Sequence, residues 1–388
     1  MKIPSSEALA QFEKERTTNQ GKATDSWSEQ ATVEERVFLL RQEADPEKPI
    51  LLLREKHVSW LMHCLHVLPR GFKAFDAVQG WLAFWIVHSL DLLGATVPSE
   101  TASQVVQHIK RFEDADGGYG GGPGQCSHLA CTFSAFMALC ALGTDEALQS
   151  INRDGLRNFI LQMKQEDGSF RVSDGGETDV RAMYCALGVA GLAGFLDEDI
   201  GTALRKDCGK YLSGLQAFDG GIGGEPGGEA HGGNTFCGVA CAVIIGDKEA
   251  LDADKVLKWA VMRQMHYEGG FQGRTNKLVD SCYSYWVGAL FPLVASVNGS
   301  KKTAELFDAE ALQRYVLECC QLSNGGLRDK PGVPRDLMHT CYALSGLSVA
   351  QHFGKAKSNG VNGVRKTNPV YNLCEDKFEK AWLFFREV

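Results

Sequence analysis

The chain has 388 residues, of which 43 are glycine, 11 are proline and 44% are apolar. This composition excludes collagen, which needs glycine at every third position with abundant proline, and it excludes a disordered chain, which lacks the apolar residues for a core. Forty lysines and arginines against 48 aspartates and glutamates give a net charge of −8, which argues against a non-specific nucleic-acid binder.

Cysteine content and hydropathy bear on the compartment. Thirteen cysteines, an odd number in a long chain that opens with polar and charged residues, favour a reduced cytoplasmic protein over a disulfide scaffold. The longest uncharged, mostly apolar stretches, 185–196 and 286–297, fall below the roughly 18 residues that a bilayer span requires. We therefore expect a cytoplasmic protein that does not span a membrane.

Residues 1–48 contain no cluster of glycines. They are predicted to form an N-terminal extension, either facing a partner or partly disordered, ahead of one domain over residues 49–388. Within that domain glycine clusters recur, and we call each cluster a glycine loop. The loops are 51, 52, 49 and 56 residues apart, with a weaker unit near Gly71; they begin at Asp116, Asp167, Asp219, Glu268 and Asn324. A near-constant period is typical of a repeat architecture.

Each glycine loop lies between two predicted helices. The preceding segments have apolar residues at three- and four-residue spacing, which indicates half-buried helices; they are 103–112, 153–163, 208–216, 254–265 and 311–320. The following segments are apolar nearly all round, as inner helices should be; they are 131–143, 180–194, 235–246, 282–291 and 339–350. The pattern predicts an all-α fold, an α/α toroid of about six helical hairpins with inner and outer rings. An open HEAT-type solenoid is the alternative, although its units are shorter.

The end of the chain departs from the repeat. A polar stretch over residues 354–369 is predicted to be a long loop, and residues 376–388 a final outer helix.

Two segments carry residues that could hold a metal ion. Segment 279–286 contains Asp280 and Cys282, and segment 335–346 contains His339; aligned on their shared Cys-Tyr pairs, the two segments set His339 opposite Asp280. Carboxylate, thiolate and imidazole are all zinc ligands, and three protein ligands leave one position open for a substrate. Two other interpretations stay open: a nucleophilic triad of the same residues, or a buried cysteine that only fills space.

Polar and aromatic residues near these segments suggest a ligand. Cations and hydroxyl donors that suit a diphosphate gather at the same rim; they are Arg181, His231, Arg274, Lys277 and Tyr283. The inner helices carry aromatic residues that could face a central funnel; they are Trp81, Trp85, Tyr184, Phe236, Tyr285, Trp286 and Tyr342. Together these groups favour a long hydrocarbon that bears a diphosphate. Ordinary ion pairs and core packing are the simpler alternatives.

Several long fingerprints resemble the β subunits of protein farnesyltransferases. They are WLAFWIVHSLDLLG, DGGYGGGPGQ, EGGFQGRTNKLVDSCYSYW and GGLRDKPGVPRDLMHTCYALSGLS, and the similarity extends from about residue 49 to residue 388. The resemblance implies an α/α barrel that works only as a heterodimer with an α subunit. It implies transfer of a C15 group from farnesyl diphosphate to the cysteine of C-terminal CaaX motifs, as in small GTPases, with one zinc ion per β subunit.

Site roles follow from the resemblance position by position. It implies zinc ligands at Asp280, Cys282 and His339, and a magnesium contact to the diphosphate at Asp329. It implies diphosphate contacts from His231, Arg274, Lys277 and Tyr283, and a funnel lined by Arg181, Tyr184, Cys237 and Trp286. Trp81 and Tyr342 match the pattern of C15 enzymes, and Trp85 is counted with them as substrate-binding. The implied transfer proceeds by attack of the peptide thiol on C1 while the diphosphate leaves.

Some positions depart from the family's usual residues. They are Val78, Cys131, Asn234 and Met338, which with His128 lie near the expected peptide site. The peptide preference therefore cannot be copied from other members. Type I geranylgeranyl transfer to CaaX proteins ending in Leu is the nearest alternative. A terpene cyclase is a further alternative, but the sequence lacks the DxDD or DDxxD motif that such an enzyme needs. A non-catalytic scaffold is the last alternative, and it would need no open metal site.

Overall fold

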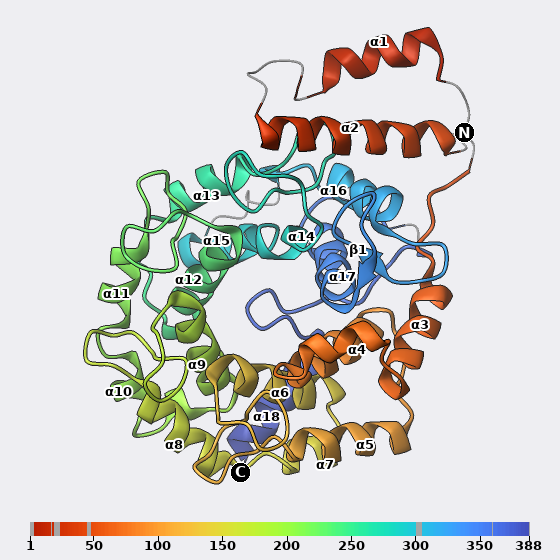
Figure 1. Cartoon of the computed structure of the whole chain (residues 1–388). Helices are drawn as coiled ribbons and strands as arrows, with labels where there is room; N and C mark the ends of the chain where they lie inside the picture. The colour runs from red at the N-terminus through yellow and green to blue at the C-terminus, as the bar shows by residue number, and fades with distance from the viewer. Residues whose placement is uncertain are drawn as a thin grey trace.

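The chain closes into a ring of helices. The computed structural model describes residues 4–16, 18, 24–44, 48–299, 305–358 and 360–387. From residue 52 onward, helices alternate between an inner and an outer ring, as Figure 1 shows along the ring axis. The predicted fold class, an all-α toroid of helical hairpins, is confirmed.

The inner ring is continuous, which distinguishes the toroid from an open solenoid. Each inner helix contacts the next, and the last one, α17, packs against the first, α4. The inner helices are α4 (Gln79–Leu92), α6 (Leu129–Leu142), α9 (Val180–Leu192), α12 (Gly232–Ile245), α14 (Tyr283–Trp286), α15 (Leu290–Asn298) and α17 (Leu337–His352). Most of their residues are buried, because one side faces the ring centre and the other faces the outer helices.

The fifth inner helix is broken, whereas the sequence predicted one helix over residues 282–291. Pro292 lies in the first turn of α15 and has no N–H to donate to the carbonyl of Gly288, so the two helices are separated by residues 287–289. The break shortens α14 to one turn next to Cys282.

The outer ring surrounds the inner one. Its helices are α3 (Arg54–His66), α5 (Ser99–Lys110), α8 (Arg153–Met163), α11 (Cys208–Leu215), α13 (Ala253–Val261) and α16 (Ala309–Tyr315), which continues as a π-helical turn η5 (Val316–Cys320). Shorter elements join them: η2 (Arg70–Phe75), α7 (Asp145–Gln149), η3 (Phe195–Asp197), α10 (Gly201–Arg205) and the antiparallel strands β1 (Leu327–Arg328) and β2 (Arg335–Asp336).

Each glycine loop connects an outer helix to an inner helix along the chain and packs against the next outer helix of the ring. The second residue of each loop is a glycine with positive φ, for example +102° at Gly220 and +88° at Gly325. A Cβ at Gly220 would collide with the carbonyl of Lys255 in α13, and one at Gly325 with that of Lys56 in α3. Only glycine fits both the backbone conformation and the close approach. The contact at Gly325 also closes the outer ring.

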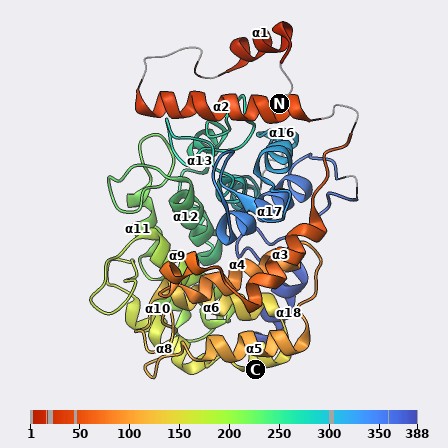
Figure 2. The same cartoon turned by 45° about the vertical axis from the view of Figure 1, so that its right-hand side comes forward.

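The N-terminal helices lie against one side of the ring. α1 (Ser6–Glu15) and α2 (Asp25–Glu43) are stacked beyond α13 and α16 (Figure 2). Gln30 Nε2 donates to Glu268 Oε1 at 2.5 Å, and Arg41 Nη1 donates to the carbonyl of Tyr267 at 2.8 Å. α2 is thus anchored on the glycine loop that begins at Glu268. The domain boundary after residue 48 and a partner-facing role of the extension stay predictions.

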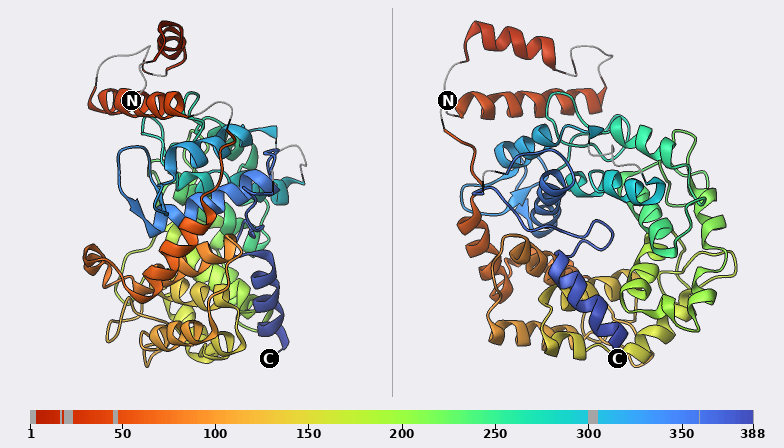
Figure 3. Two further views of the ribbon diagram at one scale, coloured as in Figure 1. Left: turned by 90° about the vertical axis from the view of Figure 1, so that its right-hand side faces the viewer. Right: turned by 180° about the vertical axis from the view of Figure 1, so that it is seen from behind.

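The C-terminal segment covers the rear face rather than completing the outer ring as predicted. α18 (Glu375–Glu387) packs on the inner helices α6 and α9, and the segment before it reaches into the ring centre (Figure 3, right). Tyr184 donates to the carbonyl of Val370 at 2.7 Å, and Tyr285 to that of Pro369 at 3.1 Å. The segment therefore forms a floor across the ring.

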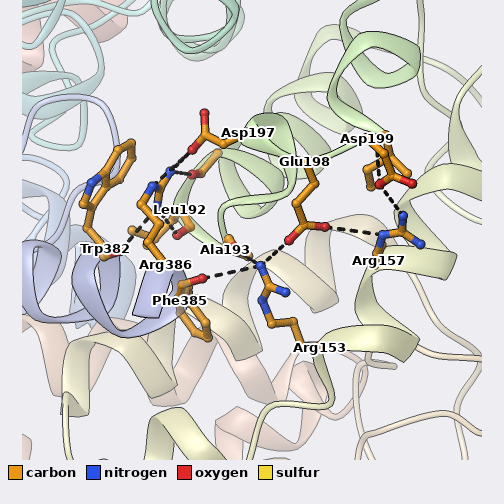
Figure 4. A network of polar contacts seen from close by, with 12 residues as sticks. Arg153, Arg157, Leu192, Ala193, Asp197, Glu198, Asp199, Trp382, Phe385 and Arg386 are labelled. Atoms are coloured by element: carbon orange, nitrogen blue, oxygen red, sulfur yellow. Dashed lines mark hydrogen bonds and ion pairs between the residues drawn. The ribbon is translucent and has the colours of Figure 1, made fainter. Parts of the chain in front are cut away.

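Arginines hold α18 to the end of α9 (Figure 4). Arg386 pairs with Asp197 at 2.7 Å and donates to the carbonyls of Gly191 and Leu192, while Arg153 pairs with Glu198. Arg386 thus donates to carbonyls of the last turn of α9, where a cation also complements the helix dipole. No helix of the described residues is long and apolar enough to cross a membrane.

Candidate active site at the front rim

The N-terminal ends of the inner helices carry one polar residue each, at the same place in every repeat. Each residue lies twelve positions after the start of its glycine loop; they are His128, Asp179, His231, Asp280 and Asp336. Each side chain accepts a hydrogen bond from a backbone N–H two or three residues further on, at 2.7–3.1 Å. The repeat thus places helix-capping groups around one rim, facing the opening of the ring.

Three predicted ligands meet at this rim. One ligand atom each of Asp280, Cys282 and His339 lies within 4.8 Å of the others. His339 Nε2 is 3.3 Å from Asp280 Oδ1, which also accepts from the backbone N–H of Cys282 at 2.8 Å. The two-residue spacing of Asp280 and Cys282 works here because both precede the single turn of α14, where the chain is not yet helical.

Asp336 fixes the orientation of His339, and sequence reasoning missed it. Its Oδ2 lies 2.6 Å from His339 Nδ1, so Nδ1 donates the proton and Nε2 is left for a metal. A metal-binding histidine commonly gives its other N–H to a carboxylate in this way. The sequence did contain a signal for Asp336. It lies twelve residues after the start of its glycine loop, as Asp280 does, so an alignment of the loops sets Asp336, and not His339, opposite Asp280.

The donor set fits zinc. Nitrogen, oxygen and sulfur donors converge with an oriented histidine, and three protein ligands suit an open zinc site. Although burial opposes it, hydrogen bonds to Asp280 and Asp336 raise the pKa of His339 to about 10. Burial and Asp280 raise the pKa of the Cys282 thiol well above its usual range.

His231 and Tyr283 form a donor pair beside the three ligands. His231 Nδ1 accepts from the N–H of Gly233 at 3.1 Å, so the proton lies on Nε2, which is 2.9 Å from the Tyr283 hydroxyl. Burial and Arg274 lower the pKa of His231, which keeps the ring neutral. Because Nε2 donates to the hydroxyl, the hydroxyl proton of Tyr283 stays available for an anionic ligand.

Close backbone approach holds Tyr283 in place. A Cβ at Gly273 would collide with the end of its ring, and a Cβ at Gly232 would lie 2.9 Å from the ring edge. Gly232 N–H also donates to the carbonyl of Gly273 at 2.7 Å, which joins two neighbouring repeats.

The predicted cations differ in their pairing. Arg274 pairs with Glu229 at 2.7 Å, and Arg181 donates through Nε to Asp179 at 2.9 Å, so the simpler interpretation of ion pairing holds for both. Both guanidinium groups are partly exposed and could turn to an anion. Lys277 is exposed, and its ammonium has no ion-pair partner among the described residues.

A cavity of about 470 Å³ opens between the inner helices below the rim. Its volume lies within the usual range for small-molecule sites. Six of the predicted substrate-binding residues line it: Trp81, His128, Arg181, Tyr184, Cys237 and Trp286. The ring of Tyr342 lies 4.3 Å from that of Trp286, and the ring of Trp85 lies 5.8 Å from that of Trp81, measured between centroids. Tyr342 and Trp85 are both buried and do not line the cavity. Lys277, Arg274 and Tyr283 are not part of the lining.

Asp329 lies close to the three ligands. The backbone N–H of Ser281 donates to its carbonyl at 2.9 Å, and its carboxylate pairs with Lys330 through Oδ2. Oδ1 is buried without a hydrogen-bond partner among the described residues. Burial and the charge of Asp280 raise the pKa of Asp329, although Lys330 opposes this shift.

The four departures from the usual residues lie at or near the same rim. Val78, Asn234 and Met338 are half-buried, whereas Cys131 is buried with its thiol 3.7 Å from the carbonyl of Ala77. That these four residues shape a peptide site stays a prediction.

Comparison with known proteins now decides the family. The family described as the Prenyltransferase alpha-alpha toroid domain matches residues 52–373. The protein farnesyltransferase subunit beta of Arabidopsis thaliana is 41% identical over 77% of this chain and 73% of its own. The chain belongs to the protein farnesyltransferase β-subunit family.

Other relatives of this β-subunit family agree. The protein farnesyltransferase subunit beta of Pisum sativum is 36% identical over 81% of this chain and 91% of its own. The geranylgeranyl transferase type-1 subunit beta of Arabidopsis thaliana is 30% identical over 78% and 86%. A solved chain of the Candida albicans protein geranylgeranyltransferase-I complexed with GGPP shares the fold, with a TM-score of 0.71 and 21% identity over 85% of this chain and 98% of that chain.

Proposed function

We propose that the chain is the catalytic β subunit of a zinc-dependent protein farnesyltransferase. It would transfer a C15 group from farnesyl diphosphate to the cysteine of C-terminal CaaX motifs, in an obligate heterodimer with an α subunit in the cytoplasm. One observation carries the proposal: Asp280, Cys282 and His339 converge at the start of α14, whose Trp286 lines an aromatic cavity.

The cavity would take the hydrocarbon. Trp81, Tyr184 and Trp286 line it, and the apolar wall stabilises an isoprenoid by removing its surface from water at about 25 cal/mol per Å². Tyr342 packs against Trp286, and Tyr184 of the lining donates to the carbonyl of Val370 in the segment that crosses the ring. These bulky side chains would favour a C15 group over a longer C20 group.

The rim would bind the diphosphate and stabilise it as it leaves. The free hydroxyl proton of Tyr283 and the ammonium of Lys277 donate to its oxygens, with Arg274 turning from Glu229 to join them. Such donors matter most where negative charge develops in the transition state. Asp329, whose Oδ1 lacks a partner among the described residues, would hold a magnesium ion against the diphosphate.

The three rim ligands would position the peptide thiol. Zinc, when bound by Asp280, Cys282 and His339, would lower the pKa of a substrate thiol at its open position. Through its bond to Nδ1, Asp336 keeps Nε2 of His339 directed at the place where the zinc ion itself would bind. The thiol would then attack C1 of the isoprenoid, the bond from C1 to the diphosphate would break, and no covalent bond to the protein would form.

Replacement of one ligand tests the proposal. Cys282→Ala in the purified heterodimer should remove zinc from the rim and abolish transfer to a CaaX peptide. It should leave farnesyl diphosphate binding largely unchanged, because Cys282 does not line the cavity. Cys140→Ala, which removes a buried thiol from α6 that is not one of the three rim ligands, is the matched control. Normal turnover by Cys282→Ala would overturn the proposed ligand set.

A further inference from the structure

A second group of metal-binding side chains lies in the interior, near the end of α4 away from the rim. One ring nitrogen of His88, one carboxylate oxygen of Asp91 and the sulfur of Cys374 lie within 4.8 Å of one another. His88 and Cys374 are 0% exposed and Asp91 is 7% exposed. Imidazole, carboxylate and thiol are the same three donors that meet at the rim.

His88 has the protonation pattern of a metal ligand. Its Nε2 lies 3.1 Å from Asn372 Oδ1, which can only accept, so the proton lies on Nε2 and Nδ1 carries a bare lone pair. Nδ1 has no hydrogen-bond partner among the described residues. A histidine ligand commonly donates its second nitrogen to an oxygen in this way.

Asp91 also has unused capacity. Asp91 pairs with Arg365 through Oδ1, whereas Oδ2 is buried with no partner among the described residues. Unpaired buried polar atoms are costly and rare in proteins, so two of them in one cluster call for a missing partner.

The charges balance if a divalent metal binds. Its two positive charges would offset Asp91 and a deprotonated Cys374, while His88 stays neutral. The neighbouring Arg365 pairs with Asp376, which is outside the cluster, so the site would carry no net charge into the interior. A water molecule in a fourth position would give the amide nitrogen of Asn372, which also lacks a partner among the described residues, an acceptor.

We propose that His88, Asp91 and Cys374 bind a second zinc ion, which ties the first inner helix to the C-terminal segment. His88 lies nine residues into α4, about 14 Å from its rim end at 1.5 Å per residue, so this ion is structural and separate from the rim. Cys374 directly follows the segment whose carbonyls at Pro369 and Val370 accept from Tyr285 and Tyr184. The ion would therefore hold the floor of the cavity.

Metal content of the full chain, purified with its α subunit and dialysed, tests this proposal. We expect about two zinc ions per chain in the wild type and about one in either Cys282→Ala or Cys374→Ala, because structural zinc binds tightly enough to survive dialysis. The control Cys140→Ala should keep both ions. A wild type with one ion, and a Cys282→Ala variant with none, would overturn the second site.

Cobalt substitution keeps the test decisive if Cys374→Ala fails to fold. Cobalt-loaded Cys282→Ala leaves the interior site intact, and it should show the near-ultraviolet thiolate-to-cobalt band with a tetrahedral visible spectrum. Asp91→Asn, which preserves the side-chain shape, should weaken that signal. No thiolate band in cobalt-loaded Cys282→Ala would contradict the proposal. The experiment measures metal binding and not prenyl transfer. A failure of the second zinc site can therefore be distinguished from a failure of the proposed function.

Discussion

At the scale of single residues, the rim depends on which nitrogen of each histidine carries the proton. Asp336 accepts from Nδ1 of His339 and leaves Nε2 free, whereas the backbone N–H of Gly233 occupies Nδ1 of His231 and sends the Nε2 proton to Tyr283. His339 can therefore bind a cation through Nε2, whereas His231 leaves the hydroxyl proton of Tyr283 available to bind an anion.

Asp336→Asn should weaken zinc binding at the rim by about 10–100-fold, because an amide does not hold the imidazole of His339 as a carboxylate does. Asp308→Asn is the matched control, since Asp308 caps the outer helix α16 through Ala311 in the same way and lies away from the rim. Competition with a chelator of known zinc affinity measures the change. Equal zinc affinities in the two variants would remove Asp336 from the metal site.

Lys277→Ala should weaken farnesyl diphosphate binding by roughly tenfold or more, as expected for loss of one charged hydrogen bond. Lys248→Ala removes an exposed lysine just after the C-terminal end of α12, which is the end away from the rim. This variant should leave the affinity for farnesyl diphosphate unchanged. Titration calorimetry or a fluorescent isoprenoid analogue gives both constants. An unchanged affinity in Lys277→Ala would place that lysine outside the diphosphate site.

At the scale of elements, the contact between α2 and the ring includes a buried acid. Glu268 is 0% exposed and bonds to Gln30, and its Oε2 has no partner among the described residues. Burial raises the pKa of Glu268 from 4.5 to about 7. Because the folded-state pKa is the higher one, the stability from this group is fully present below pH 4.5 and is lost as the pH rises through about 7.

Glu268→Gln should therefore stabilise the protein at pH 8, by up to roughly 3 kcal/mol at 1.36 kcal/mol per unit of pKa, and should make little difference near pH 4.5. Asp219→Asn changes the equivalent residue of another glycine loop, which accepts from Trp259, and serves as the control. Thermal unfolding across this pH range measures both. A stabilisation of Glu268→Gln that did not grow with pH would contradict the buried-acid account.

At the scale of the whole molecule, the ring is held by equivalent contacts repeated around it. Each glycine loop packs on the next outer helix, and the loop at Gly325 meets α3, which brings the last repeat to the first. The glycine period in the sequence was sufficient to predict this architecture, because every repeat needs a glycine at the same close approach.

Gly325→Ala should destabilise the protein by roughly 3 kcal/mol or more, since it combines a strained positive φ with a collision against Lys56. Gly227→Ala has a similar φ of +78° but open space around its Cβ, so it should cost only about 1–2 kcal/mol. Chemical denaturation compares them. Equal losses would mean that strain alone, and not ring closure, explains the glycine.

The parts that sequence could not predict depend on contacts between distant residues. Asp280, Cys282 and His339 could be proposed because each begins an inner helix, and helix starts share one rim. The position of α18 could not, since it depends on Arg386 meeting Asp197 across 189 residues. The group of His88, Asp91 and Cys374 was also hidden, because α4 and the C-terminal segment meet only when the ring is closed.

The central claim is that this rim and cavity transfer a C15 group. The most direct test gives the heterodimer equal concentrations of farnesyl and geranylgeranyl diphosphate with a limiting CaaX peptide, and weighs the product by mass spectrometry. The account predicts that the C15 adduct on the peptide cysteine predominates, because the bulky Trp81 and Trp286 line the cavity and Tyr342 packs against Trp286. A predominant C20 adduct, or an unmodified peptide, would contradict it.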